Sequence, residues 1–124
     1  MNIIAFLSIG SNLPDGAVHI NRALDFLREN YSDVDCSDIY STPSVTIGDD
    51  SVYFNAVAKC TVNDINALNA ELKCYESECG RVRGQKSIVI DLDIVMANDE
   101  ILRPRDFSRE YFQIGYTQIL TKNS

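Results

Sequence analysis

The sequence has no tryptophan and only one histidine, and it contains few of the features that mark a membrane or secreted protein. A membrane-spanning helix needs about 20 consecutive apolar residues, and no apolar run here approaches that length. The first residues, 1–7, carry no basic group ahead of their apolar run, so they do not predict a signal peptide. We therefore expect a cytoplasmic protein with no membrane partner.

Cysteine pairs with metal-site spacing are also missing. The chain has four cysteines, but no CxxC pair occurs and the single histidine is His19, so a zinc site is not predicted. Without a secretory signal, we expect four reduced thiols rather than disulfides. These cysteines are Cys36, Cys60, Cys74 and Cys79.

Positive charge is scarce, because 11 lysines and arginines stand against 18 acidic residues and the formal net charge is −7. Nucleic-acid binding needs a basic surface, so it is not expected. Many of the cations are concentrated in the second half of the chain, at Arg81, Arg83, Lys86, Arg103, Arg105 and Arg109. A local cationic patch on an acidic protein suits a small anion better than a polymer.

The spacing of apolar residues predicts one α+β domain over residues 1–124, a usual length for one domain. Apolar runs and helical periods alternate in the order strand, helix, strand, strand, helix, strand. The second helix is expected to be capped by Asn63 and ended by Gly80. This order is the ferredoxin-like βαββαβ arrangement, with an antiparallel sheet and the helices on one face. The expected strands are 3–9, 34–42, 53–62 and 88–96. Beyond 98 the pattern indicates a short extension over 101–103 and then a helical turn or tail from 106.

The last expected strand carries two acids on one side. In a strand, alternate side chains share a face, so Ile88, Ile90, Leu92, Ile94 and Met96 would face the core. Asp91 and Asp93 would then lie on the other face, about 7 Å apart. A divalent cation such as Mg²⁺ would relieve their repulsion, and Mg²⁺ prefers one or two carboxylates completed by waters and phosphates. The alternative is a solvated face on which each aspartate pairs with a lysine or arginine.

Two arginines follow the second expected helix. Arg81 and Arg83 would point the same way from an extended loop, and arginine forks match phosphate oxygens. The alternative is that they neutralise Glu76 and Glu78. Tyr53 and Asn55 share one face of their strand, where asparagine is unusual. That asparagine indicates a ligand contact, or else an edge position.

Five segments occur in an order that resembles the 6-hydroxymethyl-7,8-dihydropterin pyrophosphokinase family. They are SIGSNL (8–13), IYSTPSV (39–45), YFNAV (53–57), ECGRVR (78–83) and IDLDIVM (90–96). The resemblance implies a ferredoxin-like domain that transfers the β,γ-pyrophosphate of ATP to the pterin hydroxymethyl group in folate biosynthesis and releases AMP. It also implies dependence on two Mg²⁺ ions, with ATP as co-substrate and a reduced pterin as substrate.

The resemblance also implies roles for individual residues. Asp91 and Asp93 match the metal-binding pair, and Arg81 and Arg83 match the catalytic, phosphate-handling arginines. The implied pterin site comprises Thr42, Val45, Tyr53, Asn55 and Tyr111, with Tyr111 as a stacking ring. The implied nucleotide side comprises Glu76, Arg81, Arg83, Lys86 and Arg109.

The sequence departs from the family pattern near the arginines. The loop after Arg83 is shorter than usual, the expected tryptophan is missing, and Ser87-Ile88 replaces a Pro-Arg pair, for which Lys86 could substitute as a point charge. These departures leave open a second hypothesis, a catalytically impaired relative that binds a pterin or nucleotide without turnover. A third is a structural domain that pairs through a sheet edge. We expect a monomer, with a homodimer as the alternative.

Overall fold

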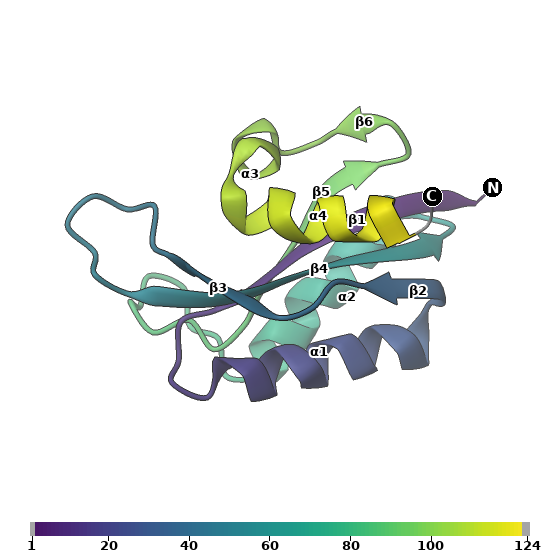
Figure 1. The fold of residues 1–124 in the computed structure, drawn as a ribbon. Helices are drawn as coiled ribbons and strands as arrows, with labels where there is room; N and C mark the ends of the chain where they lie inside the picture. Colours follow the sequence, from purple (N-terminus) through teal and green to yellow (C-terminus); the bar gives the residue numbers. More distant parts are fainter. Residues whose placement is uncertain (1, 123–124) are drawn as a thin grey trace.

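The computed structural model describes residues 2–122, and its centre is a six-stranded antiparallel sheet with helices on both faces (Figure 1). The strand order is β2-β4-β1-β5-β6, and β3 also pairs with β4. The predicted α+β class and the ferredoxin-like core are confirmed. Residues 1, 123 and 124 lie outside the described part. The elements are β1 Ile3–Ser11, α1 Gly16–Asn30, β2 Ser32–Cys36, β3 Tyr40–Pro43, β4 Val52–Val62, α2 Ile65–Glu78, β5 Asp91–Ala97, β6 Glu100–Ile101, α3 Pro104–Ser108 and α4 Glu110–Lys122.

The segment predicted as one strand over 34–42 forms two short strands on the same partner. Cys36 of β2 pairs with Ala58, and Tyr40 of β3 pairs with Asn55. Ser37 lies between the two strands and makes two hydrogen bonds with Val57. Ser37 N donates to Val57 O at 2.9 Å, and Val57 N donates to the Ser37 hydroxyl at 2.9 Å. The side chain thus replaces a ladder bond where the backbone turns, so pairing with β4 is kept on both sides.

Two hydrophobic clusters hold the layers together. Helices α1 and α2 pack on one face of the sheet, as predicted, through residues such as Leu24, Leu27, Leu68 and Leu72. The C-terminal region, for which only a turn or tail was indicated, forms α4 and covers the other face with Phe112 and Ile119. In Figure 1, α1 and α2 lie below the sheet and α4 lies above it.

Gly115 allows α4 to approach β4 closely. A Cβ atom at this position would lie 2.6 Å from Val57 Cγ2 and 2.8 Å from Ser37 Oγ. These distances are shorter than van der Waals contact, so a larger residue would push the helix away from the sheet. This close contact sets the distance between the sheet and α4, the helix that carries Tyr111 in its first turn.

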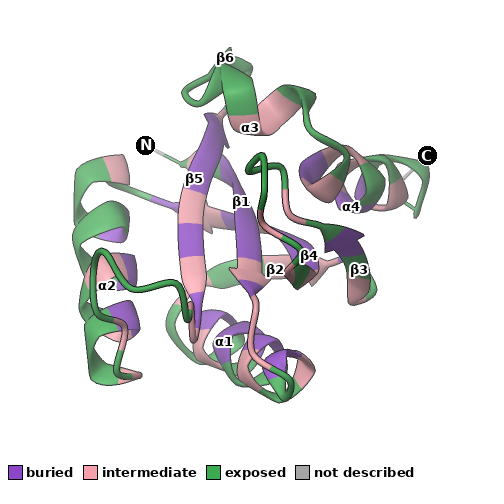
Figure 2. Cartoon of the chain, turned by 90° about the vertical axis from the view of Figure 1, so that its left-hand side faces the viewer, coloured by how far each residue is buried: buried purple, intermediate pink, exposed green. Residues whose placement is uncertain are grey.

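A bulge in β5 changes which side chains face which layer. Phe6 pairs with Met96 but Leu7 pairs with Ile94, so the ladder skips Val95. A bulge shifts the alternation of faces by one residue. As predicted, Ile90, Leu92 and Ile94 join the cluster under α1 and α2, but Met96 joins the α4 cluster, and that part of the prediction was wrong. Figure 2 shows buried and intermediate residues alternating along β5 before the bulge.

The helix termini follow the predicted pattern with one shift. The N-cap of α2 is Asp64, whose carboxylate accepts a hydrogen bond from Ala67 N, rather than the predicted Asn63. Gly80 follows α2 with a φ of 92°, which a glycine adopts without strain. No helix within residues 2–122 is both long and apolar enough to cross a membrane.

Candidate active site

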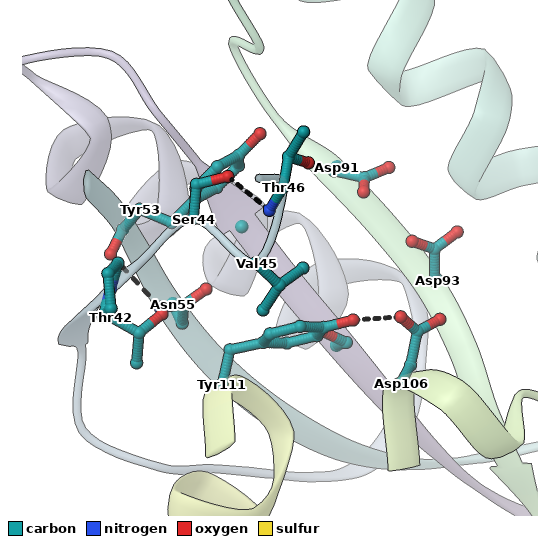
Figure 3. A pocket seen from close by; sticks show the side chains of 13 residues that line it. Thr42, Ser44, Val45, Thr46, Tyr53, Asn55, Asp91, Asp93, Asp106 and Tyr111 are labelled. Atoms are coloured by element: carbon teal, nitrogen blue, oxygen red, sulfur yellow. Dashed lines mark hydrogen bonds between the residues drawn. The ribbon is translucent and has the colours of Figure 1, made fainter. Parts of the chain in front are cut away.

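A cavity of about 160 Å³ opens where β1, β5, the β3–β4 connection and the start of α4 meet. Its lining includes predicted site residues from four separate parts of the sequence, which the fold brings together. The lining residues are Ser8, Gly10, Thr42, Pro43, Ser44, Val45, Thr46, Tyr53, Asn55, Asp91, Asp93, Asp106 and Tyr111. Figure 3 shows Tyr53, Thr42 and Asn55 on one side and Asp91, Asp93 and Asp106 on the other.

The first side, the neutral wall, consists of Thr42, Tyr53 and Asn55. Asn55 is 3% exposed, and its Nδ2 donates to Thr42 Oγ1 at 2.8 Å and to Tyr53 O at 3.2 Å. Asn55 pairs with β1 on one side and β3 on the other, so an edge position does not explain this asparagine. Its amide oxygen is left as an acceptor in a fixed position, as a ligand contact requires.

Tyr111 closes the cavity from the start of α4. Its hydroxyl donates to Asp106, and the Arg103 guanidinium donates to the same carboxylate. Its backbone carbonyl accepts from Tyr40 Oη at 2.5 Å. Burial, followed by the contact with Asp106, raises the pKa of Tyr111. The ring is therefore held at both ends, with its phenol protonated.

The acidic wall, on the second side, is formed by Asp91 and Asp93 of β5, whose carboxylates lie near each other in Figure 3. Arg81 Nη1 lies 3.2 Å from Asp91 Oδ1. Lys73 Nζ lies 3.2 Å from Asp93 Oδ1, and Arg103 Nη1 lies 3.9 Å from it. Asp91 and Asp93 therefore lie on one face of β5, as predicted. Each is also paired with a lysine or arginine of this chain, as in the alternative.

Burial is the main cause that raises the pKa of Asp93, and the charge of Asp91 adds to it. The charges of Lys73 and Arg103 act in the opposite direction but do not cancel these effects. A carboxylate whose charged form is disfavoured in this way is typical of a site that binds a cation.

Side chains from α2 and its following loop cover the outer edge of β5. At Leu92 this edge has no strand partner within residues 2–122, because β6 pairs only with Met96 and Ala97. Instead, Leu92 N donates to Glu76 Oε2 at 2.6 Å, and Lys73 Nζ donates to Leu92 O at 2.8 Å. Arg81 donates to Ile90 O at 3.1 Å. These bonds satisfy the strand edge and fix Asp91 and Asp93 relative to α2.

Glu76 is almost fully enclosed, with its side chain 2% exposed. Its carboxylate accepts from Leu92 N, Lys73 Nζ and, at 3.0 Å, Arg83 Nη2. Thus the structure places this predicted nucleotide contact inside the fold, where it connects α2 to β5.

The two predicted arginines diverge instead of pointing the same way. Gly84 has a φ of 85°, and Gln85 N donates to Val82 O, so the loop turns tightly and is not extended. Arg81 therefore runs along β5 to Asp91, whereas Arg83 turns back to Glu76. The alternative, in which the two arginines neutralise Glu76 and Glu78, thus holds for Arg83 and Glu76. Arg81 Nε is the one buried side-chain nitrogen or oxygen in residues 2–122 that makes no hydrogen bond, so this guanidinium has donor capacity to spare.

Lys86 and Arg109 are exposed and do not line the cavity. Asn12 fixes the backbone at Lys86, because its Nδ2 donates to Lys86 O at 2.6 Å and its Oδ1 accepts from Ile88 N at 2.6 Å. Arg109 lines a neighbouring surface hollow that shares Thr42, Val45 and Tyr111 with the cavity. Both cations therefore lie outside the cavity.

The donor set at Asp91 and Asp93 suits Mg²⁺ only if a ligand completes it. Residues 2–122 contain no cluster of three or more His, Cys, Asp or Glu side chains that could enclose a metal ion. Mg²⁺ is usually held by one or two carboxylates, with waters and substrate phosphates in the other positions. Two carboxylates at an open cavity therefore fit a Mg²⁺–phosphate site and not an all-protein cage.

Sequence reasoning did not assign three charged residues to this site, although Arg103 was named as a member of the cationic patch. Lys73 precedes Glu76 by three residues on α2, a spacing that places both on one helix face and was a usable signal. Arg103 lies in the turn that leads into α3 and Asp106 lies in α3, a region for which only a short extension and a helical turn or tail from 106 were indicated. Nothing local in the sequence indicated that they would reach Asp93 and Tyr111.

An α+β domain with a paired-carboxylate wall opposite an aromatic and amide wall fits the class of small-molecule phosphotransferases. Residues 6–121 match the family model of 7,8-dihydro-6-hydroxymethylpterin-pyrophosphokinase, HPPK. The chain belongs to this family. The folic acid synthesis protein fol1 of Schizosaccharomyces pombe is 36% identical to it over 79% of this chain. The matched region is 14% of that relative, so the chain spans only a small part of the relative's length.

Proposed function

We propose that this chain is a Mg²⁺-dependent pyrophosphokinase that makes a folate precursor from ATP and 6-hydroxymethyl-7,8-dihydropterin. The observation that carries the proposal is the cavity in which Asn55 and Tyr111 lie opposite Asp91 and Asp93. An aromatic heterocycle and a polyphosphate need these two surfaces within one cavity. Membership of the HPPK family and the similarity to a folic acid synthesis protein support the proposal.

The reaction needs positioning and charge neutralisation more than a covalent nucleophile. The pterin hydroxymethyl oxygen attacks the β-phosphorus of ATP, the bond from that phosphorus to the α,β-bridging oxygen breaks, AMP leaves and the hydroxyl proton is lost. Asn55 would orient the pterin edge and Tyr111 and Tyr53 would hold its ring. Two Mg²⁺ ions bound at Asp91 and Asp93 would neutralise the phosphate oxygens.

The cations divide into two groups. Arg81 does not line the cavity, but its guanidinium is paired with Asp91, so it would be the cation that lies beside phosphates bound at the acidic wall. Arg83, Lys86 and Arg109 are exposed and would reach the nucleotide only if their segments closed over it. Glu76 is enclosed, and we propose that it positions β5 and does not touch adenosine.

The proposal is tested by chromatography of a mixture of the protein, ATP, Mg²⁺ and 6-hydroxymethyl-7,8-dihydropterin. AMP should form only when all of these are present. A folded protein that forms no AMP in the complete mixture contradicts the assigned activity.

A second candidate is a relative that binds a pterin or nucleotide without turnover. It is favoured by the internal pairing of both metal-site aspartates with Lys73, Arg81 and Arg103. Calorimetry that detects pterin and nucleotide binding in a protein that releases no AMP would support this candidate. Catalytic release of AMP would eliminate it.

We also propose that residues 1–124 form one monomeric domain. The covered edge of β5 at Leu92 leaves little main chain there for another copy to pair with. Light scattering at micromolar concentration should give the mass of one chain, and the mass of a dimer would contradict the proposal.

A further inference from the structure

Lys73 holds a position that links the scaffold to the acidic wall. Its ammonium lies 2.8 Å from Leu92 O, 3.1 Å from Glu76 Oε2 and 3.2 Å from Asp93 Oδ1. A lysine ammonium has three donors, so these three acceptors use its full capacity. Leu92 O lies on the edge of β5, and Glu76 binds that edge from α2. Asp93, the third acceptor, lines the cavity.

The charge of Lys73 affects any metal ion that binds at Asp93. A cation that takes Asp93 Oδ1 must displace the ammonium or lie close to it, and like charges at such separations repel strongly when they are partly buried. Arg103, at 3.9 Å from the same oxygen, adds to this repulsion. A polyphosphate would remove the penalty, because it brings negative charge that both the metal ion and the ammonium can contact.

We propose that Lys73 makes divalent-metal binding at Asp91 and Asp93 dependent on nucleotide phosphate. Without nucleotide, the ammonium is the counterion of Asp93 and competes with a metal ion. With nucleotide, the phosphates accept the ammonium and the metal ion together. This inference rests on the proposed function, since it takes the aspartates as the metal site, but it concerns the coupling of two ligands and not turnover.

The test measures binding of Mn²⁺ by electron paramagnetic resonance, with and without a non-transferable ATP analogue. Lys73→Met keeps the aliphatic stem and removes the charge. It should bind Mn²⁺ alone roughly five- to tenfold more tightly than the wild type, a usual size for coupling between two ligands. The strengthening of Mn²⁺ binding by the nucleotide should shrink by the same factor, because the coupling is reciprocal.

Lys122→Met is the matched control. Lys122 Nζ lies 3.1 Å from Asp35 Oδ1 and 3.2 Å from Cys36 O, so it has a similar aspartate and carbonyl pairing away from the cavity. It should leave both Mn²⁺ affinities unchanged. Lys73→Arg keeps the charge and should behave as the wild type does.

Three outcomes would overturn the proposal. Unchanged Mn²⁺ binding in Lys73→Met, with unchanged strengthening by nucleotide, would show that Lys73 is only a structural support. An equal gain in Lys122→Met would show a general effect of net charge. Failure of every protein to bind Mn²⁺ under both conditions would contradict the metal site itself, and so the proposed function as well. If Lys73→Met does not fold, Lys73→Gln provides the same neutral comparison while it can still donate to Leu92 O.

Discussion

The neutral wall of the cavity is hydrogen-bonded within itself, whereas the acidic wall is held by cations from other parts of the fold. Thr42, Tyr53 and Asn55 come from two neighbouring strands and satisfy one another. Asp91 and Asp93 instead depend on Lys73, Arg81 and Arg103, which come from α2, the loop after it and the turn before α3. The neutral wall is thus ready for a ligand, and the acidic wall must exchange its partners to accept one.

Loss of an acid should have the largest effect. Asp93→Ala removes one of the two carboxylates on β5 and should lower the rate of AMP formation about 10³-fold, since bound metal ions contribute several kcal/mol to phosphate transfer. Pterin binding, measured by calorimetry, should stay near the wild-type value because the neutral wall is intact. Full activity in both Asp91→Ala and Asp93→Ala would show that the acidic wall is not the metal site.

Loss of the Asn55 amide should instead weaken pterin binding and leave metal binding unchanged. Asn55→Ala removes the fixed acceptor and the bond to Thr42, and it should weaken pterin binding roughly 10- to 100-fold. Binding of Mn²⁺ with a nucleotide analogue should not change. If Asn55→Ala weakens both equally, the two walls are not separate binding surfaces.

The Tyr111 hydroxyl should contribute less. Tyr111→Phe keeps the ring but removes its bond to Asp106, and it should weaken pterin binding by about fivefold, the value of one hydrogen bond that orders an aromatic side chain. Tyr116→Phe, on α4 in its aromatic cluster with Phe112, is the matched control and should leave pterin affinity unchanged. A larger loss in the control than in Tyr111→Phe would contradict the role of the Asp106 contact.

The smallest effect is on stability. Burial, reinforced by Asp91, raises the pKa of Asp93, so between the unfolded and folded pKa values the folded protein holds a proton that the unfolded chain has lost. The free energy of unfolding therefore falls as pH rises through this interval. In metal-free protein, Asp93→Asn avoids that loss and should melt at a higher temperature than the wild type at neutral pH. The gap should close at about pH 3, where Asp93 is protonated in both the folded and the unfolded wild type. A lower melting temperature of Asp93→Asn at neutral pH would contradict this account.

The sequence predicted the parts of the site that depend on a local pattern. Alternation along β5 placed Asp91 and Asp93 on one side, and the motifs on β3 and β4 placed Thr42, Tyr53 and Asn55 together. Strand periodicity needs only neighbouring residues, so the shared faces of Asp91 with Asp93 and of Tyr53 with Asn55 did not require the tertiary fold. The place of Thr42 beside them was implied by the family resemblance.

The parts that were missed depend on contacts between distant elements. The bulge at Val95 and the Ser37 link between β2 and β3 arise from pairing with β1 and β4. Arg103 and Asp106 become site residues only because the turn after β6 returns to β5, where Leu102 N and Arg103 N both donate to Val95 O. No periodic signal in 98–110 encodes that return.

The most direct measurement follows the phosphates of ATP labelled in its β and γ positions, in the presence of Mg²⁺ and 6-hydroxymethyl-7,8-dihydropterin. The account predicts that both labelled phosphates appear together on the pterin, that the AMP carries no label, and that the transfer disappears in Asp93→Ala. Label recovered only in unreacted ATP, with the protein folded and the pterin bound, would contradict it.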